Sequence, residues 1–176
     1  METRIKVLGH PVHPMLVVLP LALFSIGVVS DLIYLFAGNT DFAAVAYWNI
    51  AIGVIGGLAA AVFGLIDWLA IPSGTRAKAI GLWHGAGNVL ITGLFAVSWL
   101  LRPSDGLYAP DFAPAALGLV GAAMALVTAW LGGELVYRLR VGVDDDAHVD
   151  APNSITSEGL VSSGSAPVRR GGTAAS

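Results

Sequence analysis

Two histidines in this chain lie where an imidazole could bind a metal ion or a haem iron. His13 follows His10 in the segment GHPVHPMLVVLP, at the edge of an apolar run, and His84 lies in the segment LWHGAGNVL. Asn88 comes four residues after His84, which places it one helical turn away. Imidazole nitrogens are common ligands of haem iron and of transition metals. The pattern therefore predicts a cofactor site built on His13 and His84, with His10 and Asn88 beside them.

Two carboxylates extend this candidate site. Asp67 lies in FGLIDWLAIP, and Glu134 lies in WLGGELVYRL. A divalent transition metal would recruit both acids together with His13 and His84. A b-type haem would need only the two histidines, as axial ligands. The sequence is compatible with either cofactor, a b-type haem or a divalent metal ion.

Structural roles are the alternative for these groups. Prolines follow His10 and His13 and fix how the first helix begins, so the imidazoles could cap the helix or touch lipid phosphate. Polar residues near the other ends of the spans, Asp31 and Asn49, are expected to hydrogen-bond to one another or to water. Each acid could pair with a nearby basic residue: Asp67 with Arg76 or Lys78, and Glu134 with Arg138.

The composition is that of a membrane protein. The chain of 176 residues is 56% hydrophobic and 12% charged, with a mean hydropathy of +0.76. A soluble domain is usually about 45–50% apolar. The sequence has no cysteine, which excludes disulfides, thiolate metal sites, iron–sulfur clusters and covalently attached c-type haem. No basic patch with interleaved aromatic residues indicates nucleic-acid binding.

Four apolar stretches are long enough to cross about 30 Å of hydrocarbon, which takes about 20 helical residues. Short connections make consecutive helices antiparallel neighbours. The sequence therefore predicts an all-α, integral membrane four-helix bundle within residues 1–140. The four spans are residues 15–37, 44–71, 80–101 and 113–136.

Basic residues predict the orientation of the bundle. Arg102 alone flanks the spans on one side, whereas six basic residues lie on the other: Arg4, Lys6, Arg76, Lys78, Arg138 and Arg140. Because Lys and Arg concentrate on the cytoplasmic side, both termini are predicted to be cytoplasmic. Residues 141–176 contain few large apolar residues and are predicted to form a disordered cytoplasmic tail.

Four ionisable residues of the spans fall in one leaflet and follow a repeat. Charged groups in a membrane interior are costly unless they are paired or coordinated, so His13, Asp67, His84 and Glu134 are expected to be partners. HPMLVVLP begins a hairpin that ends in FGLIDWLAIP, and LWHGAGNVL begins one that ends in WLGGELVYRL. This similarity predicts two like-oriented helical hairpins related by an axis along the membrane normal.

Four segments together carry a resemblance to a known family. GHPVHPMLVVLP, GLIDWLAIP, WHGAGN and WLGGELVYRLRVGV resemble the bacterial membrane-protein family catalogued as domain of unknown function 2231, over about residues 8 to 143. The resemblance implies a membrane bundle, located in a bacterial inner membrane. Some members resemble fusions to a Rieske-type iron–sulfur domain, which implies a link to electron transfer. This chain has no cysteine from which to build such a domain.

Three classes of function follow. The first is haem or metal binding in membrane electron transfer, with a redox protein or a membrane complex as partner. The second is a small carrier or proton relay that uses the same titrating groups. The third is a structural subunit of a membrane complex, whose polar residues only set the register of the helices. The sequence holds no nucleophile elbow, phosphate loop or HExxH motif of a soluble enzyme.

Overall fold

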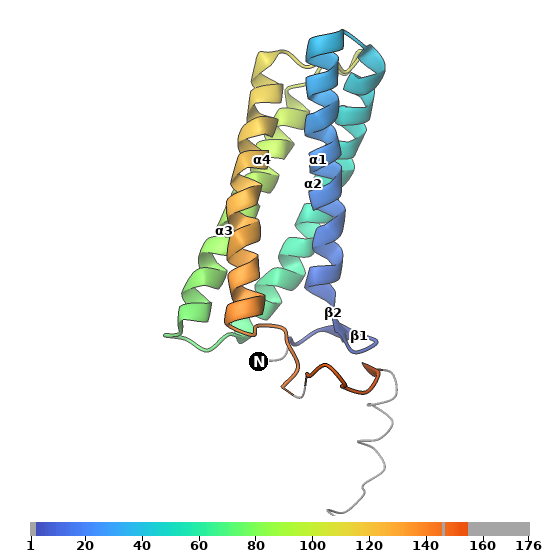
Figure 1. Cartoon of the computed structure of the whole chain (residues 1–176). Helices are drawn as coiled ribbons and strands as arrows, with labels where there is room; N and C mark the ends of the chain where they lie inside the picture. Colours follow the sequence, from blue (N-terminus) through green and yellow to red (C-terminus); the bar gives the residue numbers. More distant parts are fainter. Residues whose placement is uncertain (1–2, 146, 155–176) are drawn as a thin grey trace, which may run out of the picture.

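The computed structural model describes residues 3–145 and 147–154 and consists mainly of four long helices (Figure 1). Each is long and apolar enough to cross a membrane, which confirms the all-α membrane bundle. The last helix continues as a short π-helix, η1. The elements are β1 (Lys6–Val7), β2 (His10–Pro11), α1 (Val12–Ala37), α2 (Thr40–Ala70), α3 (Arg76–Leu100), α4 (Phe112–Gly133) and η1 (Glu134–Arg138).

Local signals set the ends of the helices. Gly38 ends α1 with a positive φ of 68°, a conformation that glycine adopts without a steric penalty. The Asn39 side chain then accepts a hydrogen bond from the Asp41 amide and begins α2. Thr75 caps α3 in the same way, at 3.1 Å from the amide nitrogen of Lys78. The two-residue connection between α1 and α2 makes them antiparallel neighbours.

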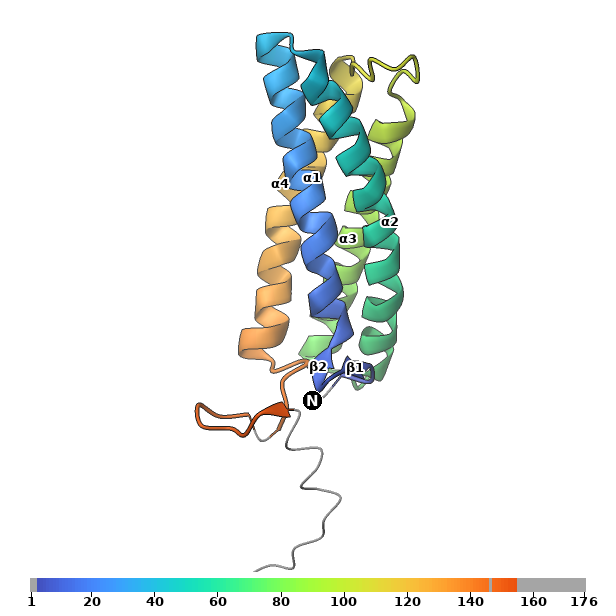
Figure 2. The ribbon, with the colours of Figure 1, turned by 90° about the vertical axis from the view of Figure 1, so that its right-hand side faces the viewer.

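The four helices form two hairpins of like orientation, as the sequence predicts. Helices α1 and α3 run in one direction and α2 and α4 in the other, seen from two perpendicular sides (Figures 1 and 2). The described N-terminal residues and the segment after η1 lie at the same end of the bundle (Figure 1). We refer to this end as the histidine end, because His13 lies in the first turn and His84 in the third turn of helices that begin there.

Packing in the middle of the bundle follows the repeat residue by residue. Phe24 of α1 and Phe95 of α3 are 71 positions apart, and their rings stack with centroids 4.0 Å apart. Each ring covers a glycine of its own hairpin partner. A Cβ added to Gly53 would lie 2.7 Å from Phe24, and one added to Gly121 would lie 2.8 Å from Phe95. These glycines are 68 positions apart, so the repeat has one offset for α1 and α3 and another for α2 and α4.

A buried ion pair joins the hairpins at the end opposite the histidines. Arg102 donates from Nη1 to Asp31 Oδ1 at 2.7 Å and from Nη2 to Asp31 Oδ2 at 2.5 Å. Both side chains are almost fully buried, with 0% and 3% exposed. The expected partnership of Asp31 with Asn49 is therefore wrong. Asn49 instead donates to the Val45 carbonyl of its own helix, because one turn of α2 already supplies an acceptor.

The described part of the segment after η1 contacts the N-terminal hairpin. Asp144 forms an ion pair with Lys6, and the Ser154 hydroxyl donates to the Leu8 carbonyl at 3.2 Å. The prediction of a disordered tail concerns residues 141–176, of which residue 146 and residues 155–176 lie outside the described residues.

Candidate functional site

His13 is anchored to the neighbouring helix by one nitrogen. Its Nδ1 lies 2.9 Å from the Ala60 carbonyl oxygen of α2. A carbonyl only accepts hydrogen bonds, so this contact assigns the proton of the neutral ring to Nδ1 and leaves the lone pair on Nε2. The ring lies against Gly64, where an added Cβ would be 2.8 Å from His13 Cε1. Among the described residues nothing hydrogen-bonds to His13 Nε2.

His84 has the same anchor in the second hairpin. Its Nδ1 lies 2.8 Å from the Thr128 carbonyl oxygen of α4, and its ring lies against Gly132, where an added Cβ would be 3.0 Å from Cε1. His84 is 71 positions after His13. Thr128 and Gly132 are each 68 positions after Ala60 and Gly64. The two imidazoles therefore occupy equivalent sites of the repeat.

Asn88 hydrogen-bonds to His84 and lies within hydrogen-bond distance of Thr128. Its amide nitrogen donates to the His84 carbonyl at 2.8 Å and lies 3.2 Å from His84 Nε2. Its amide oxygen accepts from the Thr128 hydroxyl at 3.3 Å. Asn88 is thus a neighbour of the candidate ligand, on the side of the nitrogen that would bind iron.

Asp67 lies within electrostatic range of His13 but forms no ion pair with Lys or Arg among the described side chains. Its Oδ1 is buried without a hydrogen bond, while the carboxylate interacts with the backbone of Arg4 and with the charge of His13. Lys78, one of its expected partners, donates instead to the Trp68 carbonyl at 2.7 Å and lies 3.9 Å from the centroid of the Trp68 ring. The expected pairing of Asp67 with Arg76 or Lys78 is therefore wrong.

Glu134 pairs with Arg76, the other residue that was expected to pair with Asp67. Arg76, at the start of α3, donates from Nη2 to Glu134 Oε2 at 2.8 Å. The expected pairing of Glu134 with Arg138 does not form, because the chain is a π-helix from Glu134 onward. Its backbone bonds run from residue i+5 to residue i, as from the Leu139 amide to the Glu134 carbonyl, and residues four apart no longer face one another.

His10 belongs to the N-terminal hairpin and is exposed. Its Nδ1 lies 3.0 Å from the Leu8 carbonyl oxygen, on the other side of a tight turn. Leu8 and Gly9 both have a positive φ, as the two central residues of a type I′ turn require. This local bond makes no link from His10 to the anchored histidines.

The histidine end thus brings together two imidazoles and one carboxylate. His13 lies within electrostatic range of both His84 and Asp67. Among the described residues, however, no three His, Cys, Asp or Glu side chains are arranged to hold a metal ion. The donors that the fold presents in equivalent positions are the two histidine Nε2 atoms.

Sequence reasoning missed the groups that orient these histidines. They are backbone carbonyls and the glycines beneath the rings, none of which has a distinctive side chain. The signal was nevertheless present in the repeat. In each hairpin the residue with the accepting carbonyl and the glycine are four positions apart, as Ala60 and Gly64 in the first and Thr128 and Gly132 in the second.

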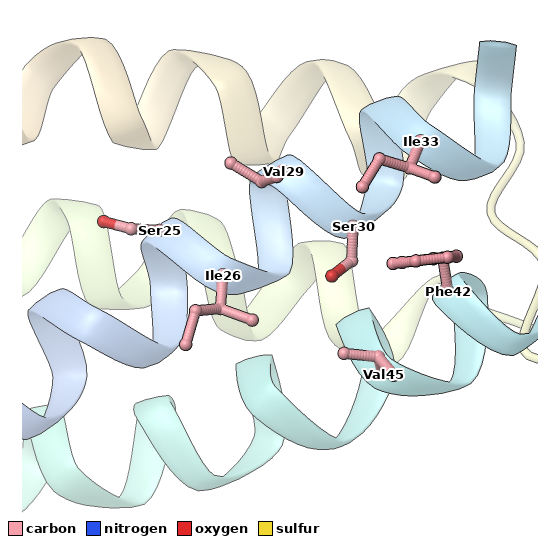
Figure 3. Close-up of a pocket in the computed structure, with 7 residues that line it drawn as sticks. All are labelled: Ser25, Ile26, Val29, Ser30, Ile33, Phe42 and Val45. Carbon is pink, nitrogen blue, oxygen red and sulfur yellow. The ribbon is translucent and has the colours of Figure 1, made fainter.

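Two surface grooves are lined by residues of the helices. One, of about 380 Å³, separates α1 from α2 and is lined mainly by apolar side chains that include Ile26, Val29 and Val45 (Figure 3). These three side chains are exposed, as lipid-facing residues of a bilayer protein are. The other, of about 350 Å³, lies between α3 and α4 beside Trp83 and Thr128. Neither groove is lined by either histidine.

The comparisons with known proteins agree with this architecture. No curated protein and no solved structure matches the chain. A family model described as "Predicted membrane protein (DUF2231)" matches residues 9–145, which include all four helices and both anchored histidines. The chain therefore belongs to the DUF2231 family of membrane proteins.

Proposed function

We propose that this protein binds a b-type haem at the histidine end and takes part in electron transfer within the bacterial inner membrane. His13 and His84 would be the axial ligands, each through Nε2. The observation that carries the proposal is the equivalent anchoring of the two rings, Nδ1 to Ala60 at 2.9 Å and Nδ1 to Thr128 at 2.8 Å. Metal-binding histidines commonly donate their second ring nitrogen to a carbonyl in this way.

The chemistry of the donors fits haem better than it fits a bare ion. Haem iron takes one or two axial ligands from the protein, whereas a structural or catalytic transition-metal ion takes three or four. Of the two acids that a bare ion would recruit, Glu134 is held by Arg76 and only Asp67 lies near His13. A divalent metal on His13, His84 and Asp67 is therefore the alternative cofactor.

Residues of α2 and α4 would orient the two histidines that hold the haem. The carbonyls of Ala60 and Thr128 fix each imidazole in the tautomer that leaves Nε2 unprotonated, and glycines beneath the rings allow the close approach. For His84 to bind iron, the Asn88 amide would have to leave Nε2. When bound, haem would supply a one-electron change of iron valence. Asp67, with an unbonded buried oxygen beside His13, is placed to hold a proton that balances this charge.

The orientation in the membrane belongs to the same proposal. Six basic residues flank the spans at the histidine end, so this end would face the cytoplasm and both termini would be cytoplasmic. A redox protein or a subunit of a membrane complex on that side would then exchange electrons with the site.

The test is a spectrum of the purified protein in mild detergent. We expect haem added to the wild-type protein to give a saturable Soret shift and a reduced-minus-oxidised α-band. Replacement of His13 or His84 by alanine should abolish or weaken this binding, and the double variant should be little worse than either single one, because the ligands act as a unit. His148→Ala, which removes an exposed imidazole outside the bundle, is the matched control. Absence of saturable binding would contradict the proposal.

A second candidate, a proton relay, is favoured by the unbonded Oδ1 of Asp67 beside His13. In proteoliposomes with a pH-sensitive dye inside, a relay would give a proton leak that Asp67→Asn removes. A leak that is equal in the variant and in the wild type would exclude Asp67 from such a path.

A further inference from the structure

The groove between α1 and α2 contains a hydroxyl group without a partner. Ser30 of α1 is 3% exposed, and its side chain points toward α2 beside Phe42 (Figure 3). Its hydroxyl forms no hydrogen bond among the described residues. The hydroxyls of four other residues in these helices donate to a backbone carbonyl, namely those of Ser25, Thr92, Ser98 and Thr128. Because the hydrocarbon of a bilayer holds no water, a bound molecule with an acceptor atom would satisfy the Ser30 hydroxyl there.

The second hairpin has no hydroxyl at the equivalent position. The offset of 71 positions that relates α3 to α1 places Leu101 at the position of Ser30. The offset of 68 positions that relates α4 to α2 places Pro110 at the position of Phe42. The groove described in the second hairpin lies toward the histidine end instead, beside Trp83. The fold that the hairpins share therefore does not require a serine here, and Ser30 is specific to the groove of the first hairpin.

The length of α1 places Ser30 inside the hydrocarbon of the bilayer. The 26 residues of α1 extend over about 39 Å, which is roughly 9 Å more than the hydrocarbon thickness of about 30 Å. Ser30 comes seven residues before Ala37, the last residue of α1, and so lies about 10 Å from that end of the helix. An α1 centred in the bilayer therefore holds the hydroxyl roughly 5 Å below the headgroup boundary. A neutral acceptor can reach this depth at a much lower cost than a phosphate can.

The lining of the groove also favours a neutral ligand with a flat ring. None of the lining residues is charged, and apart from its two serines the groove is formed by Phe42 and aliphatic side chains. The nearby carboxylate of Asp31 is already paired with Arg102, which leaves neither charge for a ligand. The ring of Phe42 lies beside the Ser30 hydroxyl, where a second flat ring can stack on it (Figure 3). The volume of about 380 Å³ is within the range of about 300–1,000 Å³ that is usual for small-molecule sites.

We propose that this groove binds a neutral lipophilic quinone. One ring carbonyl oxygen would accept a hydrogen bond from Ser30 Oγ, with the ring against Phe42 and the apolar chain along Ile26 toward the middle of the bilayer. The site is separate from the histidine end, because Ser30 and His13 are 17 positions apart on α1, about 25 Å along the helix. Quinone binding is therefore expected to survive in the His13→Ala variant, whether or not the wild type binds haem.

Titration of the protein in lipid nanodiscs with a decyl-substituted benzoquinone tests this proposal. Quinones quench tryptophan fluorescence, and Trp48 comes one helical turn after Val45, which lines the groove. We expect saturable quenching of the wild type. Ser30→Ala should weaken the affinity by roughly twofold to tenfold, which is the effect of losing one neutral hydrogen bond. Ser30→Leu copies Leu101 of the second hairpin and fills the groove, so it should abolish saturable quenching.

Two further variants serve as controls. Ser30→Thr keeps the hydroxyl and should retain most of the affinity, which separates loss of the hydrogen bond from loss of the fold if Ser30→Leu does not fold. Thr92→Val removes a hydroxyl outside the groove, which donates to the Asn88 carbonyl at 2.9 Å, and should bind the quinone as the wild type does.

Other occupants of the groove would give different results. Equal affinities of the wild type and both the alanine and leucine variants of Ser30, or no saturable quenching at all, would overturn the proposal. Mass spectrometry of the purified protein then identifies the occupant. A phospholipid that the wild type retains and Ser30→Leu loses, without quinone binding, would make the groove a phospholipid site. A dimer that Ser30→Leu dissociates, again without quinone binding, would make it a contact between two copies of the chain.

Discussion

Phe24 and Phe95 lie face to face between the two hairpins, with ring centroids 4.0 Å apart and planes 4° from parallel. They are equivalent residues of the repeat, so the stack marks the axis about which one hairpin is turned onto the other. Both rings are buried, together with Val28, Ile50 and Ile91. The stack fixes the level at which the hairpins meet, and with it the level of the two histidines 11 residues earlier in each helix.

Removal of one ring of this stack should destabilise the bundle strongly. Phe95→Ala leaves a cavity between Phe24 and Gly121, and large-to-small changes of this kind cost about 3–5 kcal/mol of the free energy of unfolding. Denaturation with sodium dodecyl sulfate, followed by tryptophan fluorescence, measures the loss. Phe112→Ala, at a side chain that is 84% exposed, is the control. Equal losses for the two variants would show that the stack does not hold the hairpins together.

The glycines beneath the rings should not tolerate a methyl group. Gly53→Ala and Gly121→Ala would place a Cβ at 2.7 and 2.8 Å from a phenylalanine ring, and such overpacking costs about 1–3 kcal/mol. Gly93→Ala should instead be neutral or stabilise by about 0.5–1 kcal/mol, because its added Cβ meets nothing within 4 Å and alanine favours the helix. The ordering of the three melting temperatures checks this, and a destabilised Gly93→Ala would contradict it.

Replacing only one partner of the ion pair between Asp31 and Arg102 should lower the free energy of unfolding strongly. Asp31→Asn or Arg102→Met leaves a buried charge unpaired, which costs about 3–5 kcal/mol. Replacing both by apolar residues, as in Asp31→Leu with Arg102→Met, should recover most of that loss. A double-mutant cycle on the unfolding free energies gives the coupling between the two residues. Strict additivity of the single losses would show that the pair is not coupled.

The orientation of the bundle can be checked with fusions. A reporter fused after Arg140 should be active in the cytoplasm, and one inserted in the connection between α3 and α4, at residues 103–110, should be active in the periplasm. Both reporters test the same distribution of basic residues, which concentrates at the histidine end. Opposite signals from the two fusions would place the histidine end on the outer side.

The parts of the fold that depend on hydropathy could be predicted from the sequence, and the register between helices could not. The four helices and the two like-oriented hairpins follow from long apolar runs and short connections. The internal repeat predicted from the sequence aligns Asp67 with Glu134, which are 67 positions apart. The packed residues of α2 and α4 that correspond to one another are 68 positions apart. Glu134 is therefore equivalent to Ile66, and the apparent match of the acids is off by one residue.

The same limit applies to the candidate site. His13 and His84 could be singled out because ionisable residues are rare in membrane spans. Their anchors could not, because backbone carbonyls leave no mark in the sequence and depend on how α1 is set against α2. The sequence predicts Arg102 only as a residue that flanks the spans and bears on orientation. Its pairing with Asp31 depends on the contact between hairpins, which no local pattern encodes.

The buried ion pair between Asp31 and Arg102 depends on the covalent link between the two hairpins. Asp31 and Arg102 are 71 positions apart, so they are the same position in the two copies. Two identical hairpins meeting about a twofold axis would bring a residue against itself there, aspartate against aspartate or arginine against arginine, and like charges would repel. Opposite charges at a self-facing position require two non-identical copies. The single chain thus permits an attraction that a symmetric dimer of hairpins is unable to form.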